Sequence, residues 1–367
     1  MGHVTQICNH IANLGIFFMR LLSFFFWTFI FLVFFISPIV SYASTQEINF
    51  LNPNKNKQYG NFLAGRYALQ QFKDEDAISY FQNALSGDKK SLVILKELFY
   101  TYLLNGEIKK ASSIVGKSLK LNDNLSNIQF VVRGTEKFNL KKFGSAQKVF
   151  EKIKGFPSLE NWNYQNNSTL KQVLLAWSYA GSKKINAALK ALDNIDDQEF
   201  IKGYIDFHRA LICDYLDDSR AENFYISAIE TKGSIQSRVY LFYAHFLTES
   251  GDDLNAKKLL ESYNRESRSD LNINWAIKNF KEFSKEVYFK ANPNRAVAES
   301  FFLNANLLYD RDLISTLSFL QLALFLDKNF YEPKLLIAEI YETNRLYNRA
   351  VEHYGAIPSQ SPLYASA

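Results

Sequence analysis

Residues 77–85 read Ala-Ile-Ser-Tyr-Phe-Gln-Asn-Ala-Leu, and this short stretch decides the fold. Phe81 and Ala84 follow Ala77 by four and seven positions, which places all three on one face of an α-helix. A second small residue, Gly65, precedes Ala77 by twelve positions. Because antiparallel helices approach closely only where their side chains are small, the two small residues predict the crossing point of a helical hairpin.

The same pairing of a small residue with a later alanine recurs along the chain. The further pairs are Gly134 with Ala146, Ala176 with Ala188, Ala244 with Ala256, Ala338 with Ala350, and the slightly shorter Ala210 with Ala221. The positions expected on second helices are 77, 111, 146, 188, 221, 256, 316 and 350, and five of the seven intervals between them are 33 to 35 residues. A fixed period of this length predicts an array of helical hairpins.

The repeat resembles the tetratricopeptide family, and in particular exported proteobacterial proteins that contain it. Residues 350–354 repeat the pattern of 77–85, and Leu121-Asn122-Asp123 is similar to the family's Leu-Asp-Pro-Asn unit ending. Glycines at 106, 181 and 251 lie where the family places its turns. The resemblance implies an all-α fold, a right-handed α-solenoid of about eight antiparallel helix pairs. The expected units are 58–91, 92–125, 127–160, 169–202, 203–235, 237–270, 297–330 and 331–364.

One interval in the array is longer than the others. The 60 residues between positions 256 and 316 exceed one unit, and residues 272–288 there have the pattern of an extra amphipathic helix. We therefore expect six units over 58–270, a spacer helix and linker over 271–296, and two further units over 297–367.

The N-terminal segment predicts export. Leu21 to Val40 is an uncharged, apolar run of 20 residues, preceded by Arg20 and followed by Ser41-Tyr42-Ala43. A positive flank, an apolar core and a small-x-small site predict a signal peptide over 1–43, a linker over 44–57 and a mature N-terminus at Ser44. Starting at Met19 would give a more compact signal. The alternative is a retained inner-membrane anchor, and in both cases the rest of the chain is periplasmic or exported.

The sequence offers little to catalysis. Neither a helical pair of metal-binding histidines, nor a phosphate-binding loop, nor a nucleophile elbow occurs in it. We therefore expect a protein that is not an enzyme, with no catalytic, cofactor-binding or metal-binding residues and no cofactor. Cys213 is expected to be a buried thiol, and the acidic cluster Asp214, Asp217 and Asp218 a solvated turn.

The net charge is 42 − 37 = +5, a small excess that we expect to be spread along the chain. A nucleic-acid reader gathers its basic residues into a patch, so no nucleic-acid partner is expected. Contact with a membrane is expected only through residues 21–40.

The first helices of such a solenoid line its concave face, which the resemblance makes the partner-binding groove. Its expected residues are Phe62, Arg66, Lys96, Tyr100, Phe138, Trp177, Tyr204, Phe207 and His245. An aromatic groove of this kind suits an extended or helical peptide. The alternative for each aromatic side chain is simple packing between neighbouring units.

The sequence therefore predicts a non-catalytic protein-interaction scaffold of the bacterial envelope. The alternative is a subunit of an envelope biogenesis or export complex with an enzymatic activity that no motif identifies. A further expectation concerns the last unit, because the tail 359–367 is too short for a capping helix. Leu336, Ile340, Ala350, Val351 and Tyr354 should then be partly uncovered and available for self-association or a partner.

Overall fold

The described part of the chain is built from α-helices. The computed structural model describes residues 53–367 except 122, 155–168, 196–198, 232–235, 267–269 and 286–288. The expected signal peptide and most of the linker lie outside these residues. The chain divides into two compact units, Met1–Asn56 and Lys57–Ala367. No strand occurs among the described residues.

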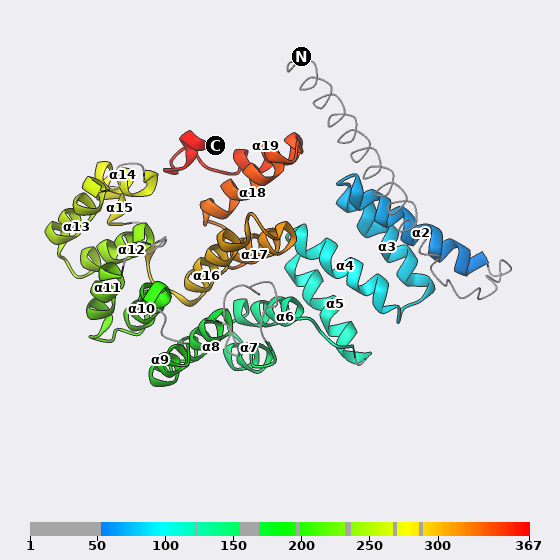
Figure 1. Ribbon diagram of the computed structural model, residues 1–367, viewed down its shortest axis with the longest axis horizontal. Helices are drawn as coiled ribbons and strands as arrows, with labels where there is room; N and C mark the ends of the chain where they lie inside the picture. Colours follow the sequence, from blue (N-terminus) through cyan, green and yellow to red (C-terminus); the bar gives the residue numbers. More distant parts are fainter. Residues whose placement is uncertain are drawn as a thin grey trace, which may run out of the picture. The chain divides into compact units, whose positions relative to one another are not determined.

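The helices form consecutive antiparallel pairs, as the repeat predicts (Figure 1). The first five pairs are α2 (Pro53–Gln70) with α3 (Asp74–Gly87), α4 (Leu92–Leu104) with α5 (Ile108–Lys120), α6 (Asn127–Asn139) with α7 (Phe143–Phe150), α8 (Thr169–Gly181) with α9 (Ile185–Asp193), and α10 (Glu199–Tyr215) with α11 (Ala221–Glu230). The remaining pairs are α12 (Gln236–Glu249) with α13 (Asp253–Glu266), α16 (Pro293–Leu308) with α17 (Leu313–Leu326), and α18 (Tyr331–Thr343) with α19 (Tyr347–Gly355). The all-α, tetratricopeptide-like solenoid expected from the sequence is confirmed.

The turn inside seven of the eight pairs has a recurring backbone conformation, and the turn between α16 and α17 lacks it. Five residues before the second-helix alanine, φ is positive at Phe72, Gly106, Lys141, Lys183, Gly251 and Arg345, and Asp217 has the same conformation four residues before Ala221. A left-handed residue ends a helix sharply and lets the chain reverse. The conformation at these equivalent positions fixes the register of the repeat.

The predicted helix crossings are close-packed. Ala77, Ala146, Ala188 and Ala256 are fully buried and Ala350 nearly so. A methyl group added to Gly65 would approach the Phe81 ring to 2.7 Å. Small residues are therefore required where the first helix meets the large residue of the second.

The stretch between the sixth and seventh pairs contains two short helices, α14 (Leu271–Lys278) and α15 (Phe280–Phe283). They pack against the preceding pair, with α14 contacting both α12 and α13. Asn292 then begins α16, since its side chain accepts a hydrogen bond from the Arg295 amide and Pro293 occupies the first turn.

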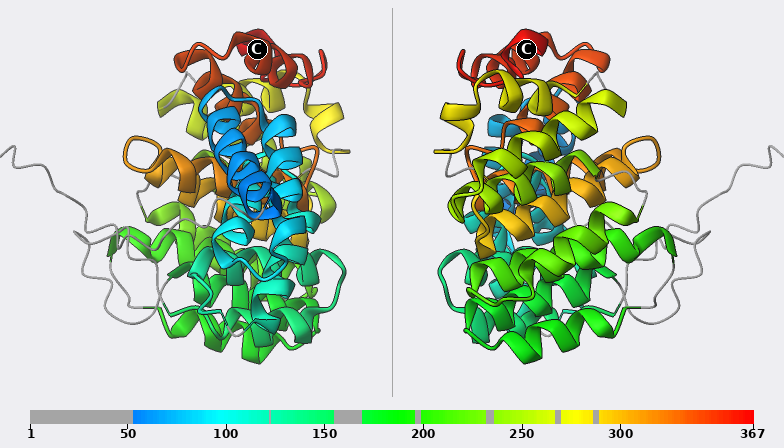
Figure 2. Two further views of the ribbon diagram at one scale, coloured as in Figure 1. Left: turned by 90° about the vertical axis from the view of Figure 1, so that its right-hand side faces the viewer. Right: turned by 90° about the vertical axis from the view of Figure 1, so that its left-hand side faces the viewer.

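The seventh pair does not continue the stack in the ordinary way. Helix α16 packs against α8 and α10, and α17 packs against α4, α5 and α6 (Figures 1 and 2). The pair thus lies against the inner helices of the earlier pairs. Helix α17 is apolar on nearly all sides, and six consecutive residues, 318–323, are buried. Such a helix is stable only when it is surrounded.

The last pair is better covered than the sequence predicted. Ile340 and Ala350 are buried, and Leu336 and Tyr354 are half-buried. The short 3₁₀ helix η3 (Tyr364–Ser366) follows Leu363, which is itself buried. Of the five residues expected to be uncovered, Val351 is the exposed one, at 67%. None of the described helices combines the length and the hydrophobicity that crossing a bilayer requires.

Candidate functional site

The middle of the expected groove is closed by the protein's own helices. Phe138, Trp177, Tyr204, Phe207 and His245 are all buried. We had expected them to line an open surface, and this expectation is corrected. A partner cannot reach these five side chains in this structure.

The covering groups differ along the array. The Phe138 ring packs edge-on against Phe143 of the following helix at 5.0 Å. The His245 ring meets Phe283 of α15 at 6.1 Å. The middle of the face, around α8 and α10, is covered by α16. The period of the sequence does not predict that α16 covers α8 and α10, because α16 is far from both along the chain.

A buried hydrogen-bonded chain joins α8, α10 and α16. The indole N–H of Trp177 donates to Nδ1 of His208 at 3.0 Å, and Nε2 of His208 lies 3.1 Å from Oγ of Ser300. Because Nδ1 accepts, the neutral ring carries its proton on Nε2 and donates it to Ser300. The Ser300 hydroxyl in turn donates to the Ala296 carbonyl.

This polarity is the reverse of what a serine nucleophile needs. A general base must accept the hydroxyl proton, whereas Nε2 of His208 donates to the oxygen of Ser300. Burial lowers the pKa of His208 to about 3, so the ring stays neutral. The hydrogen bonds from Trp177 through His208 to Ser300 therefore hold α16 in place and do not activate Ser300.

An ion-pair network beside it links more distant helices. Arg238 of α12 pairs with Glu299 of α16 and, at 2.6 Å, with Glu332 of α18. Arg295 pairs with Glu299 at 2.8 Å and with Asp327 at 3.0 Å. Arg295 and Glu299 are 1% and 6% exposed, so their charges are stabilised by these ion pairs rather than by water.

Aromatic rings complete the surroundings of the two arginines. The guanidinium of Arg295 lies 3.7 Å from the centre of the Phe330 ring, and that of Arg238 lies 5.5 Å from it. A cation above an aromatic face is attracted by the ring's quadrupole. Together with the ion pairs, these contacts fix the seventh pair and α18 to α12.

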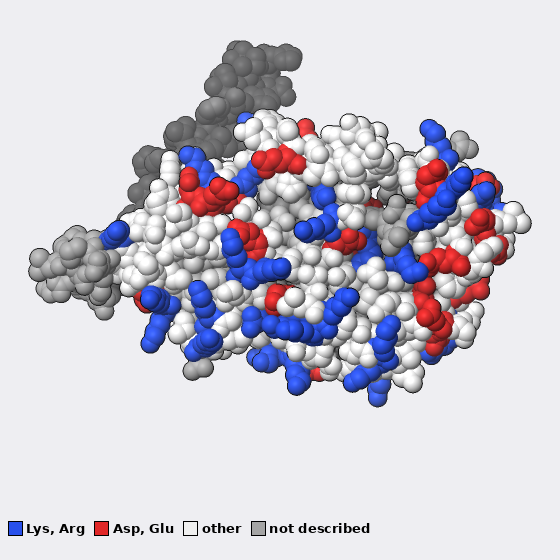
Figure 3. Space-filling model, turned by 180° about the vertical axis from the view of Figure 1, so that it is seen from behind, with Lys and Arg blue, Asp and Glu red and all other residues white. Residues whose placement is uncertain are grey.

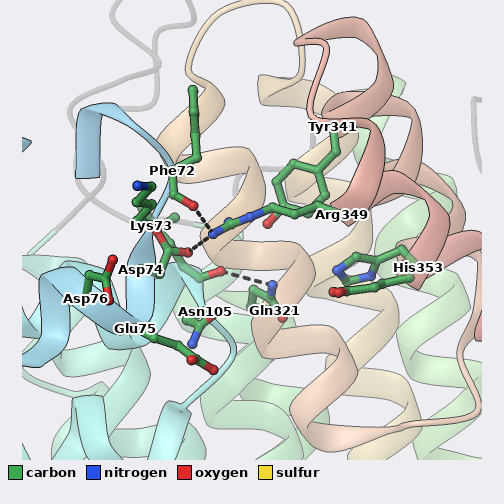
Figure 4. Close-up of a pocket in the computed structure, with 12 residues that line it drawn as sticks. Phe72, Lys73, Asp74, Glu75, Asp76, Asn105, Gln321, Tyr341, Arg349 and His353 are labelled. Carbon is green, nitrogen blue, oxygen red and sulfur yellow. Dashed lines mark hydrogen bonds and ion pairs between the residues drawn. The ribbon is translucent and has the colours of Figure 1, made fainter. Parts of the chain in front are cut away.

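A cavity of about 540 Å³ lies where the first and last pairs meet (Figure 4). Arg349 of α19 donates to the Phe72 carbonyl at 2.7 Å and pairs with Asp74 of α3 at 2.8 Å. Beside them, Gln321 of α17 donates to the Leu104 carbonyl. Figure 4 shows these side chains directed toward one another across the cavity. Their mutual pairing identifies the place as a closure contact of the array.

The N-terminal end of the expected groove is accessible. Phe62 and Tyr100 are half-buried, while Arg66 and Lys96 are exposed. Arg66 on α2 pairs with Glu97 on α4 at 2.6 Å, which joins the first two units. We name Phe62, Arg66, Lys96 and Tyr100 the open end. Their role in partner binding stays a prediction.

Cys213 is buried, as predicted, and burial raises the pKa of its thiol to about 11. The acidic residues after it are only partly a solvated turn. Asp214 is half-buried, accepts a hydrogen bond from the Tyr225 hydroxyl at 2.9 Å, and has a pKa raised to about 6 by burial. The exposed Arg220 pairs with Asp218 and lowers its pKa to about 2. Within the described residues, no group of three or more His, Cys, Asp or Glu residues is arranged to hold a metal ion.

The positive charge is gathered rather than spread, which corrects our expectation. Residues 107–190 contain 15 Lys and Arg but 5 Asp and Glu, a net charge of +10 against +5 for the whole chain. The exposed lysines of this stretch are Lys109, Lys110, Lys117, Lys120, Lys141, Lys142, Lys148, Lys152, Lys154, Lys183, Lys184 and Lys190. We name this set the lysine face. It belongs to α5, α7, α9 and the turns beside them, and many basic side chains lie in the lower half of the view in Figure 3, with uncharged surface between them.

Comparison with known proteins finds structural likeness alone. No family model matches the sequence, and no curated protein matches it. The structure of Naa15/Naa10 bound to HypK is similar at 12% identity and a TM-score of 0.39, with 83% of this chain and 53% of that chain covered. This chain therefore spans about half the length of that neighbour.

Two further solved structures are similar over most of both chains. Yeast Tom70 covers 82% of this chain and 75% of its own length at 15% identity, with a TM-score of 0.25. The tetratricopeptide domain of P58(IPK) covers 83% of each chain at 12% identity, with a TM-score of 0.21. At such scores the assignment of the fold rests on the helix pairs, turn conformations and buried crossings of this chain itself.

Proposed function

We propose that the protein is a non-catalytic scaffold of the bacterial envelope that binds protein or peptide partners. The observation that carries this proposal is the array of eight helix pairs, seven of which share the same turn conformation. Solenoids of this kind present extended surfaces built from equivalent positions of successive repeats, and binding is what such surfaces do. The apolar run at 21–40 supports export of the chain.

The partner surface that we propose is the open end rather than the whole groove. Phe62 and Tyr100 supply half-buried rings, and Lys96 supplies an exposed charge beside them. Val93 lies on the same side of α4, three and seven residues before Lys96 and Tyr100, and is 61% exposed. Apolar contact area with a charged rim suits a short amphipathic segment of a partner.

Photo-crosslinking in living cells tests this surface. A crosslinking amino acid at Lys96 should trap a discrete protein partner, whereas the same residue at Lys258, an exposed lysine of α13, should not. Tyr100→Ala should then reduce the yield of the crosslink without changing the abundance of the protein. Equal products from both positions would show that the open end has no special partner.

Export is tested separately by fractionation and intact-mass measurement. The mature chain is expected in the periplasmic or membrane fraction with Ser44 at its N-terminus. Retention of residues 21–40 in the membrane would select the anchored form. Recovery of an unprocessed chain in the cytoplasm would refute export.

A further inference from the structure

Several lysines of the lysine face occupy equivalent positions in successive units of the repeat. Lys148 and Lys190 both lie two residues after the second-helix alanine of their unit, and Lys117 and Lys152 both lie six residues after it. All four are exposed. Because equivalent positions of successive units recur along one face of a solenoid, these charges follow one another along that face. The result is a broad, predominantly basic surface, on which Glu151 and Asp193 are exposed acidic residues.

The composition of the lysine face indicates which class of partner it can bind. Protein interfaces have aromatic and arginine anchors at their centre and are depleted in lysine. Single-stranded nucleic acids stack on exposed aromatic rings. The large exposed apolar side chains on these helices and turns are Leu119 and Leu140, and Arg133 is half-buried against the Ser112 carbonyl. Over the residues that the structure describes, which exclude 155–168, the face therefore offers point charges without exposed aromatic rings or arginine anchors.

A bilayer that contains anionic lipids matches such a surface. Lysines close to it gain electrostatic energy independently of one another and need no shaped pocket. We propose that the lysine face docks the array against an anionic phospholipid surface. This inference rests on the proposed export, because residues 21–40 bring the chain to a membrane.

Lysine footprinting on the full chain, as cells process it, tests the docking. The protein is mixed with vesicles of phosphatidylcholine alone or of phosphatidylcholine with phosphatidylglycerol, and exposed lysines are acylated and quantified by mass spectrometry. At low salt we expect Lys117, Lys148, Lys152 and Lys190 to be protected several-fold by the anionic vesicles. Lysines of α13 to α15 should react equally in both, and high salt should abolish the protection.

Two matched variants locate the effect. Lys117→Gln, Lys148→Gln, Lys152→Gln and Lys190→Gln together should raise the concentration of anionic vesicles that half-protects the remaining face lysines at least about tenfold, since each lysine near an anionic surface contributes about fivefold to the affinity. The control combines Lys258→Gln, Lys278→Gln, Lys281→Gln and Lys285→Gln, all exposed in the native chain. It changes the net charge equally and should retain the protection.

Three results would overturn the proposal. One is equal protection by the two kinds of vesicle, and another is equal loss in the two variants. The third is stronger protection by duplex DNA or RNA at the same phosphate concentration, which would assign the face to nucleic acid. A cytoplasmic location from fractionation would refute the proposed export. The footprinting result would still decide whether the lysine face binds anionic lipid. Failure of the crosslink at Lys96 bears only on the open end.

Discussion

At the scale of single residues, Asp214 couples the stability of the fold to pH. Burial raises the pKa of this carboxyl to about 6, and the Tyr225 hydroxyl donates to it. Because the folded pKa exceeds the unfolded value of about 4, the folded state favours the protonated form. The destabilisation is absent below about pH 4 and complete above about pH 6.

Asp214→Asn should therefore raise the free energy of unfolding by about 1 to 3 kcal/mol at pH 7.5, with the gain vanishing toward pH 4. Urea unfolding across this range measures it. Asp217→Asn, at an exposed neighbour, is the control and should change little. A gain that is the same at every pH would refute the linkage.

The turn residue Lys141 is a second test at this scale. It holds a φ of 56°, in the region that Gly106 and Gly251 occupy in other units. Lys141→Gly should stabilise the protein by about 1 kcal/mol, because a side chain is strained in that conformation. Lys141→Ala keeps the strain and should show no such gain in the urea midpoint.

The sequence predicts some of these details and not others. Gly106 and Gly251 mark their turns directly, whereas Phe72, Lys141 and Arg345 adopt the same conformation with no local signal. Their backbone follows from the two helices on either side. That these turn residues occupy equivalent positions can be recognised only once the repeats are aligned on their second-helix alanines.

At the scale of helices, the crossing of α6 and α7 gives a test with opposite signs. A methyl group on Gly134 would lie 2.1 Å from the Phe150 ring, whereas one on Gly144 meets nothing within 4 Å. Gly134→Ala should lower stability by about 1 to 3 kcal/mol, because the ring must move. Gly144→Ala, within α7, should raise it by about 0.5 to 1 kcal/mol. Thermal unfolding of the two variants would contradict this packing if both shifted the same way.

The period of the sequence predicted the pairs because it records contacts between neighbouring helices. It could not predict that α16 packs against α8, because the curvature of the stack brings these helices together. One signal was present in residues 313–326, Leu-Ile-Ser-Thr-Leu-Ser-Phe-Leu-Gln-Leu-Ala-Leu-Phe-Leu, which carry no charged side chain. A helix that is mostly apolar and has no charged side is expected to be largely buried, and an interior place buries it. The exposed groove was therefore predicted wrongly at the residues that this pair covers.

At the scale of the whole array, the Arg238 network holds distant units together. Arg238→Met would leave Glu299 and Glu332 without their shared partner. We expect a loss of about 3 to 5 kcal/mol, because the largely buried Glu332 loses its ion pair and Glu299 keeps only Arg295. Arg349→Met removes the more exposed pair with Asp74 and should cost about 1 kcal/mol. Equal effects in urea unfolding would show that the interior network has no special weight.

The charge distribution could have been predicted from the sequence, because the excess of Lys and Arg over Asp and Glu in residues 107–190 can be counted there. It was missed because a single total of +5 averages a basic segment with an acidic remainder. What counting cannot give is the exposure of those lysines on equivalent positions of α5, α7 and α9.

The interior position of α16 and α17 sets an order of events during synthesis. The ribosome synthesises the chain from its N-terminus. Trp177, Tyr204 and Phe207 are therefore made more than 80 residues before α16, the helix that covers them, begins. An ordinary solenoid can fold unit by unit as it emerges, since each repeat needs only its neighbours. Here the first units remain incomplete until the seventh arrives, and their apolar inner surface is meanwhile open to aggregation. Folding of this chain is therefore expected to follow synthesis as one late, slow and cooperative step.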